Sequence, residues 1–336
     1  MAPFDAPARP WVIGHRGASG LRPEHTLAAF ELAIEQGADF VEPDLVPTQD
    51  GVLVARHESE IGGTTDVAAH PEFARRRATK HVNGTPVTGW FTEDFTLAEL
   101  QTLRARERLP ELRPDSAAYD GQFGIATLEE LLDLLRERSA AVGRTIGLVA
   151  ELKHASHFAS QGVPLDELLL PVLERHGLAG RGNPVFVESF EPGILRRLRA
   201  RSEVRLVQLI EAHGAPADGG ARSFADMATP EGLARIACYA DAIGPAKALI
   251  VPRAPDGSSL PATSLVADAH SAGLLVFPWT FRSENLFLPP ELRRGEDLRA
   301  HGDAAGEYRT FYDRGVDAVF SDFPAEAVRA RQEASL

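Results

Sequence analysis

The sequence alternates short apolar segments with amphipathic helical segments over most of its length, and this alternation limits the possible folds more than any other feature. The apolar segments have the length of strands, and the helical segments repeat apolar residues at intervals of three and four. Strands are predicted at 11–14, 39–45, 51–55, 145–152, 185–187, 204–209, 242–244, 274–279 and 318–321, and helices at 26–36, 127–137, 165–176, 192–200, 230–239, 264–272 and 304–314. About eight such units indicate parallel strands joined by right-handed crossovers, so we predict an α/β fold, a closed TIM (β/α)₈ barrel.

Residues 58–124 interrupt the alternation. This segment is rich in Gly, Thr, Pro and Arg, and it contains one predicted helix, at 97–106. It is too long to be an unstructured loop in a compact domain. We therefore predict a small insertion subdomain at 58–124, after the second β unit and over the barrel mouth, and assign 1–57 and 125–336 to the barrel.

Composition and charge exclude several classes of protein. The 336 residues carry a formal charge of −13, so no basic surface is expected for a nucleic acid, and an anionic substrate needs a local cation. No apolar stretch reaches the roughly 20 residues that span a bilayer. The single cysteine, Cys238, excludes a disulfide within the chain and a thiolate metal site. The expected partner is a small molecule, with no nucleic acid and no membrane span, and the oligomeric state stays open.

The N-terminal sequence MAPFDAPARPW lacks the basic and apolar regions of a secretory signal. This predicts a cytoplasmic protein, or a periplasmic or secreted one if a signal has been removed.

Acidic side chains gather at the carboxyl ends of predicted strands, which meet at one mouth in a barrel. Glu42 and Asp44 are two residues apart on one strand and so share a face, and Glu151 ends the next barrel strand. Close carboxylates repel one another unless a cation lies between them. Together the three residues predict a site for Mg²⁺ or Ca²⁺, although any one of them alone could be a solvated acid or a salt-bridge partner.

Basic side chains and histidines occupy the same strand ends. Arg16 follows His15, and Lys153 lies two residues after Glu151. A metal, a lysine and an arginine together neutralise phosphate oxygens. His15 and His57 are candidates for a general acid and base, because imidazole changes protonation near neutral pH. The chain has only three lysines among 35 basic residues, at Lys80, Lys153 and Lys247.

The stretches around these residues resemble the glycerophosphodiester phosphodiesterase family. The similar stretches are HRGASGLRPEHTLAAFELAIEQGADFVEPDL, DGVLVARHE, ELK and GVDAVFSDFP. Within the insertion, GGTTDV and FTLAEL resemble the bacterial periplasmic and plant-type branch. The resemblance implies a TIM barrel with an inserted small domain, and metal-dependent hydrolysis of glycerophosphodiesters to sn-glycerol 3-phosphate and an alcohol.

The resemblance also implies roles for individual residues. It makes His15 and His57 the general acid and base, Glu42, Asp44 and Glu151 the metal ligands, Arg16 and Lys153 the phosphate contacts, and Trp279 a residue near the substrate mouth. It further implies that a glycerol hydroxyl attacks phosphorus and that water opens the resulting cyclic phosphate. Two departures are Pro43 inside the Glu-x-Asp motif and the residues Arg56 and Glu58 that flank the second histidine.

Two other functions compete with hydrolysis. A phospholipase-D-like lyase on the same barrel would act on lysolipids. It would need an apolar surface around the barrel mouth to bind the lipid, and the acidic composition does not indicate such a surface. A catalytically silent barrel that binds polyol phosphates would need no acid and base pair, whereas both histidines and all three acids are present.

Overall fold

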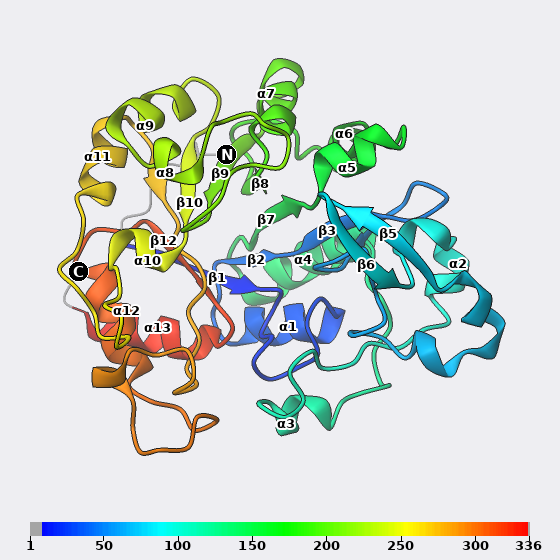
Figure 1. Ribbon diagram of the computed structural model, residues 1–336, viewed down its shortest axis with the longest axis horizontal. Coiled ribbons are helices and arrows are strands. Elements are labelled where there is room, and N and C mark those ends of the chain that lie inside the picture. The colour runs from blue at the N-terminus through cyan, green and yellow to red at the C-terminus, as the bar shows by residue number, and fades with distance from the viewer. Residues whose placement is uncertain (1–8, 335–336) are drawn as a thin grey trace.

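Eight parallel strands form a nearly closed barrel, which confirms the predicted TIM fold (Figure 1). The structure is a computed structural model that describes residues 9–334. The barrel strands are β1 (Trp11–His15), β2 (Phe40–Glu42) continued by β3 (Asp44–Pro47), β7 (Gly147–Leu152), β8 (Val185–Ser189), β9 (Arg205–Ile210), β10 (Ala242–Pro245), β11 (Leu275–Val276) and β12 (Ala318–Ser321). Their order is β11-β10-β9-β8-β7-β2-β1-β12, and a parallel bridge from Phe281 to Ser321 joins the two ends.

The long helices cover the outside of the barrel between the strands (Figure 1). The α-helices of the described residues are α1 (Leu27–Glu35), α2 (Leu97–Leu100) and α3 (Pro114–Ala117), both in the segment 58–124, α4 (Leu128–Val142), α5 (Ala155–Ser160), α6 (Leu165–Arg175), α7 (Pro192–Arg201), α8 (Phe224–Met227), α9 (Pro230–Ile236), α10 (Lys247–Ile250), α11 (Leu265–Ser271), α12 (Ala304–Tyr312) and α13 (Pro324–Glu333). The longest, α4, begins at a capping box between Thr127 and Glu130 and ends at Gly143, whose φ is 66°. The α13 helix was not predicted because its buried face carries no large apolar side chain: its buried residues are Pro324, Ala327, Ala330 and Arg331.

The second barrel strand is interrupted at Pro43, where a single strand was predicted. Proline has no N–H to donate to a neighbouring strand, and its carbonyl oxygen still accepts from Glu151 N at 2.9 Å. β2 pairs with both neighbours, β1 and β7, whereas β3 pairs with β7. Glu42 and Asp44 therefore belong to two short strands.

The strand before His57 is not a barrel strand, whereas the prediction grouped His57 with residues at the carboxyl ends of barrel strands. β4 (Leu53–Ala55) runs antiparallel to β3. The β3–β4 hairpin rises past the end of β7 and returns, so that Arg56 N donates to Asp44 O at 3.0 Å. His57 thus reaches the level of the barrel mouth by a hairpin.

The barrel interior is filled by aromatic and β-branched side chains. Its core cluster comprises Ile13, Phe40, Val149, Phe186, Val207, Ala242, Phe277, Ala318 and Phe320. The Trp11 ring packs 5.1 Å from the Phe40 ring at the amino-terminal side of the barrel. This filled interior leaves the carboxyl ends of the strands as the place for a site.

The segment 58–124 contains the hairpin of β5 (Ala78–Val82) and β6 (Thr85–Gly89), the helices α2 and α3, and short 3₁₀ turns. Its apolar residues Ile61, Phe95 and Leu100 belong to the same hydrophobic cluster as the barrel residues Leu45 and Val46. The predicted helix at 97–106 is limited to the single turn of α2. The subdomain boundaries stay a prediction. Because the segment shares a hydrophobic core with the barrel, the open question is whether 58–124 folds independently of it.

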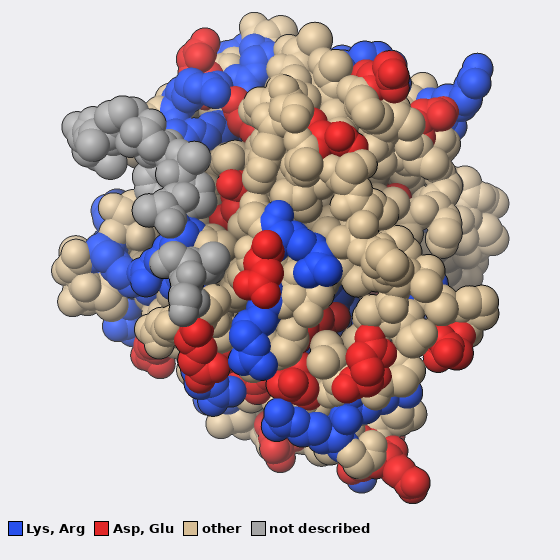
Figure 2. All heavy atoms as spheres, turned by 90° about the vertical axis from the view of Figure 1, so that its left-hand side faces the viewer, with Lys and Arg blue, Asp and Glu red and all other residues tan. Residues whose placement is uncertain are grey.

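Charged side chains of both signs are interspersed on the face shown in Figure 2. No extended basic patch is visible on that face, in keeping with the acidic composition. None of the helices within residues 9–334 combines the length and hydropathy that a membrane span requires.

Replacing Phe95 with alanine tests whether 58–124 folds as one body with the barrel. Phe95 is fully buried, and its ring lies 5.0 Å from that of Phe73. We expect a loss of about 3–5 kcal/mol in the free energy of unfolding, seen by calorimetry as one transition at a lower temperature. Val142→Ala, at a position that is 45% exposed, is the control and should shift stability by less than about 0.5 kcal/mol. Two transitions, of which only one shifts in Phe95→Ala, would show that 58–124 is an independent domain.

Candidate active site

A cavity of about 160 Å³ lies at the carboxyl ends of the barrel strands. Every residue predicted for the site except Asp44 lines it: His15, Arg16, Glu42, His57, Glu151, Lys153 and Trp279. Glu188 and Arg282, which the sequence analysis did not select, also line it. We name this cavity the catalytic cavity.

Three buried carboxylates from neighbouring strands converge in the catalytic cavity. Glu42, Glu151 and Glu188 each offer an oxygen atom, and the three atoms lie within 4.8 Å of one another. Among the described residues, Glu188 Oε2 is buried and has no hydrogen-bond partner. Burial and the neighbouring carboxylates raise the pKa values of Glu42 and Glu188. A divalent cation would offset this repulsion and give Glu188 Oε2 a partner, so the residues fit a site for a hard cation.

Glu151 lies near both a basic and an acidic side chain, Lys153 and Asp44. Lys153 Nζ lies 3.1 Å from Glu151 Oε1. Burial raises the pKa of Glu151 to about 8, with the Asp44 carboxylate adding to the rise and Lys153 opposing it. A bound cation would shift this balance toward the ionised carboxylate.

Asp44 lies beside this carboxylate cluster and is held by other side chains. His25 Nε2 lies 2.8 Å from Asp44 Oδ2, and Arg16 Nε lies 3.2 Å from the same oxygen. Lys153 Nζ is 4.0 Å from Oδ1. Burial acts to raise the pKa of Asp44, but Lys153 and Arg16 outweigh it and hold the pKa well below its usual range. Arg16 and His25 both have left-handed backbone, with φ of 59° and 62°, which aims them at Asp44.

His15 is oriented by an acidic residue from the last strand. Its Nδ1 lies 2.6 Å from Oδ1 of Asp322, which directly follows β12. Burial and the nearby Arg16 lower the pKa of His15 to about 4, although Asp322 opposes them. With a proton on Nδ1 shared with Asp322, Nε2 is the nitrogen left for proton exchange.

His57 has an equivalent partner in the next residue. Its Nδ1 lies 3.0 Å from Glu58 Oε1, and Glu58 Oε2 lies 2.9 Å from His154 Nε2. Burial, Lys153 and Arg16 lower the pKa of His57 to about 3. Glu58, one of the departures noted in the sequence, thus fixes the orientation of the second histidine.

The segment 58–124 supplies basic side chains to the surroundings of the site. Arg113 donates to Asp322 Oδ2 at 2.6 Å and to Glu284 Oε1 at 2.7 Å. Arg108 donates to Glu24 Oε2 at 3.0 Å, the oxygen that Arg16 also binds at 2.9 Å. These contacts tie the insertion to the carboxylates that position His15 and Arg16.

Trp279 forms one wall of the catalytic cavity. Its indole Nε1 donates to Gly244 O at 2.7 Å, and its ring packs edge-on against Phe190, with 5.7 Å between the ring centroids. These two contacts fix the ring where it lines the cavity.

Four residues of this site were missed from the sequence: His25, Glu188, Arg282 and Asp322. Asp322 and Glu188 could have been found by the rule that selected Glu151, since each lies at the carboxyl end of a barrel strand. His25 and Arg282 lie in loops, where the sequence gives no comparable signal.

Comparisons with known proteins identify relatives over the whole chain. The glycerophosphoryl diester phosphodiesterase family matches residues 15–326. Glycerophosphodiester phosphodiesterase GDPD6 of Arabidopsis thaliana is 34% identical over 329 residues, which cover 94% of this chain and 84% of that protein. The glycerophosphodiester phosphodiesterase of Haemophilus influenzae is 27% identical over 333 residues, 91% of this chain and 88% of that protein.

Solved structures share the fold. An Oleispira antarctica phosphodiesterase in complex with the product sn-glycerol-3-phosphate has a TM-score of 0.63 at 22% identity, covering 97% of this chain and 98% of that one. A glycerophosphodiester phosphodiesterase from Agrobacterium tumefaciens has a TM-score of 0.57 at 19% identity, covering 95% of this chain and 99% of that one.

Proposed function

Because the chain belongs to the glycerophosphoryl diester phosphodiesterase family, and is therefore a phosphodiesterase, we propose that it uses a divalent cation and two histidines to hydrolyse glycerophosphodiesters to sn-glycerol 3-phosphate and an alcohol. The observation that carries this proposal is the catalytic cavity itself. It brings together a buried carboxylate cluster, the basic side chains of Arg16 and Lys153, and two oriented histidines. The Oleispira antarctica relative, bound to sn-glycerol-3-phosphate, supports the identity of the product.

Charge neutralisation is the first requirement of the reaction. A phosphodiester is an anion, and the net charge of −13 would repel it without a local positive centre. Arg16 and Lys153 bring two buried positive charges to the cavity. A divalent cation, Mg²⁺ or Ca²⁺, held by Glu42 and Glu151 with Asp44 or Glu188 as third ligand, would add Lewis-acid polarisation of the phosphoryl oxygens.

Proton transfer is the second requirement. In the proposed reaction a hydroxyl of the glycerol arm attacks phosphorus, and water then opens the cyclic phosphate. His15 and His57 exchange a proton with the attacking and the leaving oxygen atoms and reverse their roles between the two steps. Asp322 and Glu58 support this assignment, because each fixes the Nδ1 side of one imidazole. The fixed indole of Trp279 would limit the space for the substrate on one side of the cavity.

The function is tested by measuring release of sn-glycerol 3-phosphate. We expect protein reconstituted with Mg²⁺ or Ca²⁺ to release it from glycerophosphocholine and glycerophosphoethanolamine, and chelation to stop the reaction reversibly. A coupled glycerol 3-phosphate dehydrogenase assay gives the rate. Turnover that persists after exhaustive chelation would contradict the metal requirement. A cyclic glycerol phosphate as the end product would identify a lyase.

The metal ligands are tested by calorimetry with Mg²⁺ and Ca²⁺. We expect Glu42→Gln and Glu151→Gln to weaken binding at least about tenfold, because each removes a charged oxygen ligand. Comparing Asp44→Asn with Glu188→Gln identifies the third ligand as the one whose loss weakens binding more. Glu191→Gln is the control, since Glu191 is a buried carboxylate after β8 that lies outside the cluster. Parental affinity in Glu42→Gln would show that the assignment is wrong.

The histidine roles are tested by changing the leaving group. Either His15→Ala or His57→Ala should lower kcat by about 10² to 10⁴-fold while metal affinity stays close to that of the parent. A nitrophenyl diester needs little protonation of its leaving group, so it should partly rescue the variant that lacks the acid and not the one that lacks the base. If neither variant is rescued and both keep a bell-shaped pH profile, the two histidines bind phosphate instead.

A further inference from the structure

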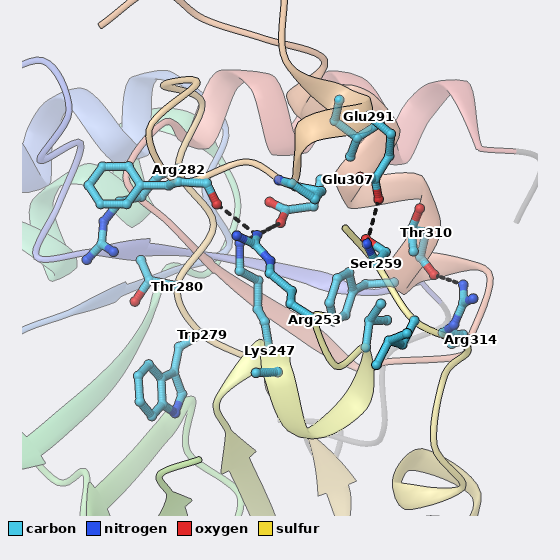
Figure 3. A pocket seen from close by; sticks show the side chains of 17 residues that line it. Lys247, Arg253, Ser259, Trp279, Thr280, Arg282, Glu291, Glu307, Thr310 and Arg314 are labelled. Carbon is cyan, nitrogen blue, oxygen red and sulfur yellow. Dashed lines mark hydrogen bonds and ion pairs between the residues drawn. The ribbon is translucent and has the colours of Figure 1, made fainter. Parts of the chain in front are cut away.

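A second, larger cavity adjoins the catalytic cavity at the barrel mouth (Figure 3). Its volume is about 430 Å³, against about 160 Å³ for the catalytic cavity. Trp279, Thr280 and Arg282, which follow β11, line both cavities. A ligand whose phosphorus lies in the catalytic cavity can therefore extend past these residues into the larger one, which we name the side pocket.

The side pocket has an excess of positive charge. Its charged lining residues are Lys247, Arg253, Arg282, Arg314, Glu291 and Glu307. Figure 3 shows Arg282 on the side of Trp279, Arg314 on the opposite side, and Lys247 with Arg253 between them. This concentration of basic side chains stands out in a chain with a net charge of −13, and it favours an anionic ligand.

The basic side chains are only partly neutralised by the protein. Lys247 Nζ lies 2.7 Å and Arg253 Nη2 3.5 Å from the same oxygen, Glu307 Oε1. Because one carboxylate cannot neutralise two cations, a positive charge remains at the centre of the pocket. Within residues 9–334, Arg314 makes no ion pair. Arg282 is paired with Asp322 at 2.9 Å, so the capacity to bind a carboxylate or a phosphate lies with Lys247, Arg253 and Arg314.

Apolar side chains also line the side pocket. They include Val251, Leu260, Phe287, Leu292 and Phe311. An apolar surrounding strengthens the attraction between a cation and a bound anion, since it lowers the local dielectric constant. The side pocket therefore suits a carbon skeleton that carries its own anionic group.

A third cavity, of about 220 Å³, adjoins the catalytic cavity across the barrel mouth and has the opposite character. It shares Glu151, Lys153 and Phe190 with the catalytic cavity, and Glu191 and Glu211 also line it. Glycerol hydroxyls can donate hydrogen bonds to these carboxylates, whereas an anion would be repelled. The two sides of the mouth therefore distinguish the two arms of a diester by charge.

Resting on the proposed phosphodiesterase function, we propose that the side pocket binds the alcohol half of the substrate and selects alcohols that carry a second anionic group, a carboxylate or a phosphate. Lys247 and Arg253 would contact that group, with Arg282 beside the scissile phosphate. In the reaction the bond between phosphorus and the alcohol oxygen breaks, and that oxygen takes up a proton. The alcohol then leaves with its anionic group unchanged.

The test compares substrates that differ only in the anionic group. Glycerophosphoserine differs from glycerophosphoethanolamine by one carboxylate, and glycerophosphoinositol 4-phosphate differs from glycerophosphoinositol by one phosphate. We expect kcat/KM to be about tenfold higher for at least one anionic member than for its counterpart, mainly through a lower KM. The pair with the larger ratio identifies the preferred anion.

Two variants with opposite expected effects assign the preference to the side pocket. Arg253→Gln should lower the ratio of kcat/KM between the anionic substrate and its counterpart about tenfold, because it removes a positively charged side chain. Glu307→Gln should raise the ratio, because it removes the carboxylate that competes with the ligand, and its melting temperature is recorded to confirm folding. Arg294→Gln is the control. Arg294 is 68% exposed at its side chain, pairs with Asp303 and lines none of the three cavities.

The outcomes separate the two proposals. If all four esters are hydrolysed and the kcat/KM ratio of the anionic member to its counterpart is at or below one in both pairs, the proposed selectivity is wrong. The phosphodiesterase function would still be supported. An equal drop in the ratio for Arg253→Gln and Arg294→Gln would also overturn it. Failure to hydrolyse any of the four esters would overturn the proposed function and the selectivity together.

Discussion

Buried charge at the barrel mouth must be matched by buried charge of opposite sign, and the arrangement of the site follows from this constraint. An unpaired ionised group in a dry interior costs several kcal/mol. Asp44 and Asp322 meet the requirement within the chain, since each contacts three basic side chains or histidines of distant segments. The carboxylate cluster of Glu42, Glu151 and Glu188 does not meet it fully.

The same ion pairs hold together segments that are far apart in the sequence. Asp322, after the last strand, binds His15 from the first strand, Arg113 from the segment 58–124 and Arg282 from the loop after β11. The insertion therefore contributes to the alignment of a catalytic candidate without reaching the catalytic cavity. A shared hydrophobic cluster reinforces this connection.

Sequence patterns were sufficient where chemistry and periodicity coincide, and insufficient where the chain leaves the regular repeat. The alternation predicted the barrel, and residues at the ends of its strands predicted most of the catalytic cavity. The close spacing of the strands predicted at 39–45 and 51–55 indicates a turn between them, but Leu53–Ala55 is apolar in the same way as a barrel strand, so His57 was grouped with the barrel strand ends. Glu188 was overlooked because the predicted strand ended at Val187, two residues before the observed end at Ser189.

Glu42 and Asp44 illustrate how neighbouring carboxylates acquire different roles. Both are buried and only two residues apart, yet the pKa of Glu42 is raised by burial and by nearby acids while that of Asp44 is lowered by Lys153 and Arg16. The residue with cationic partners is already stabilised as an anion. The residue among other acids would be stabilised as an anion by a cation in the cluster, so Glu42, Glu151 and Glu188 would supply most of the free energy of the proposed cation binding. Asp44, in turn, pairs with Arg16 and Lys153, the two residues proposed to contact the phosphate.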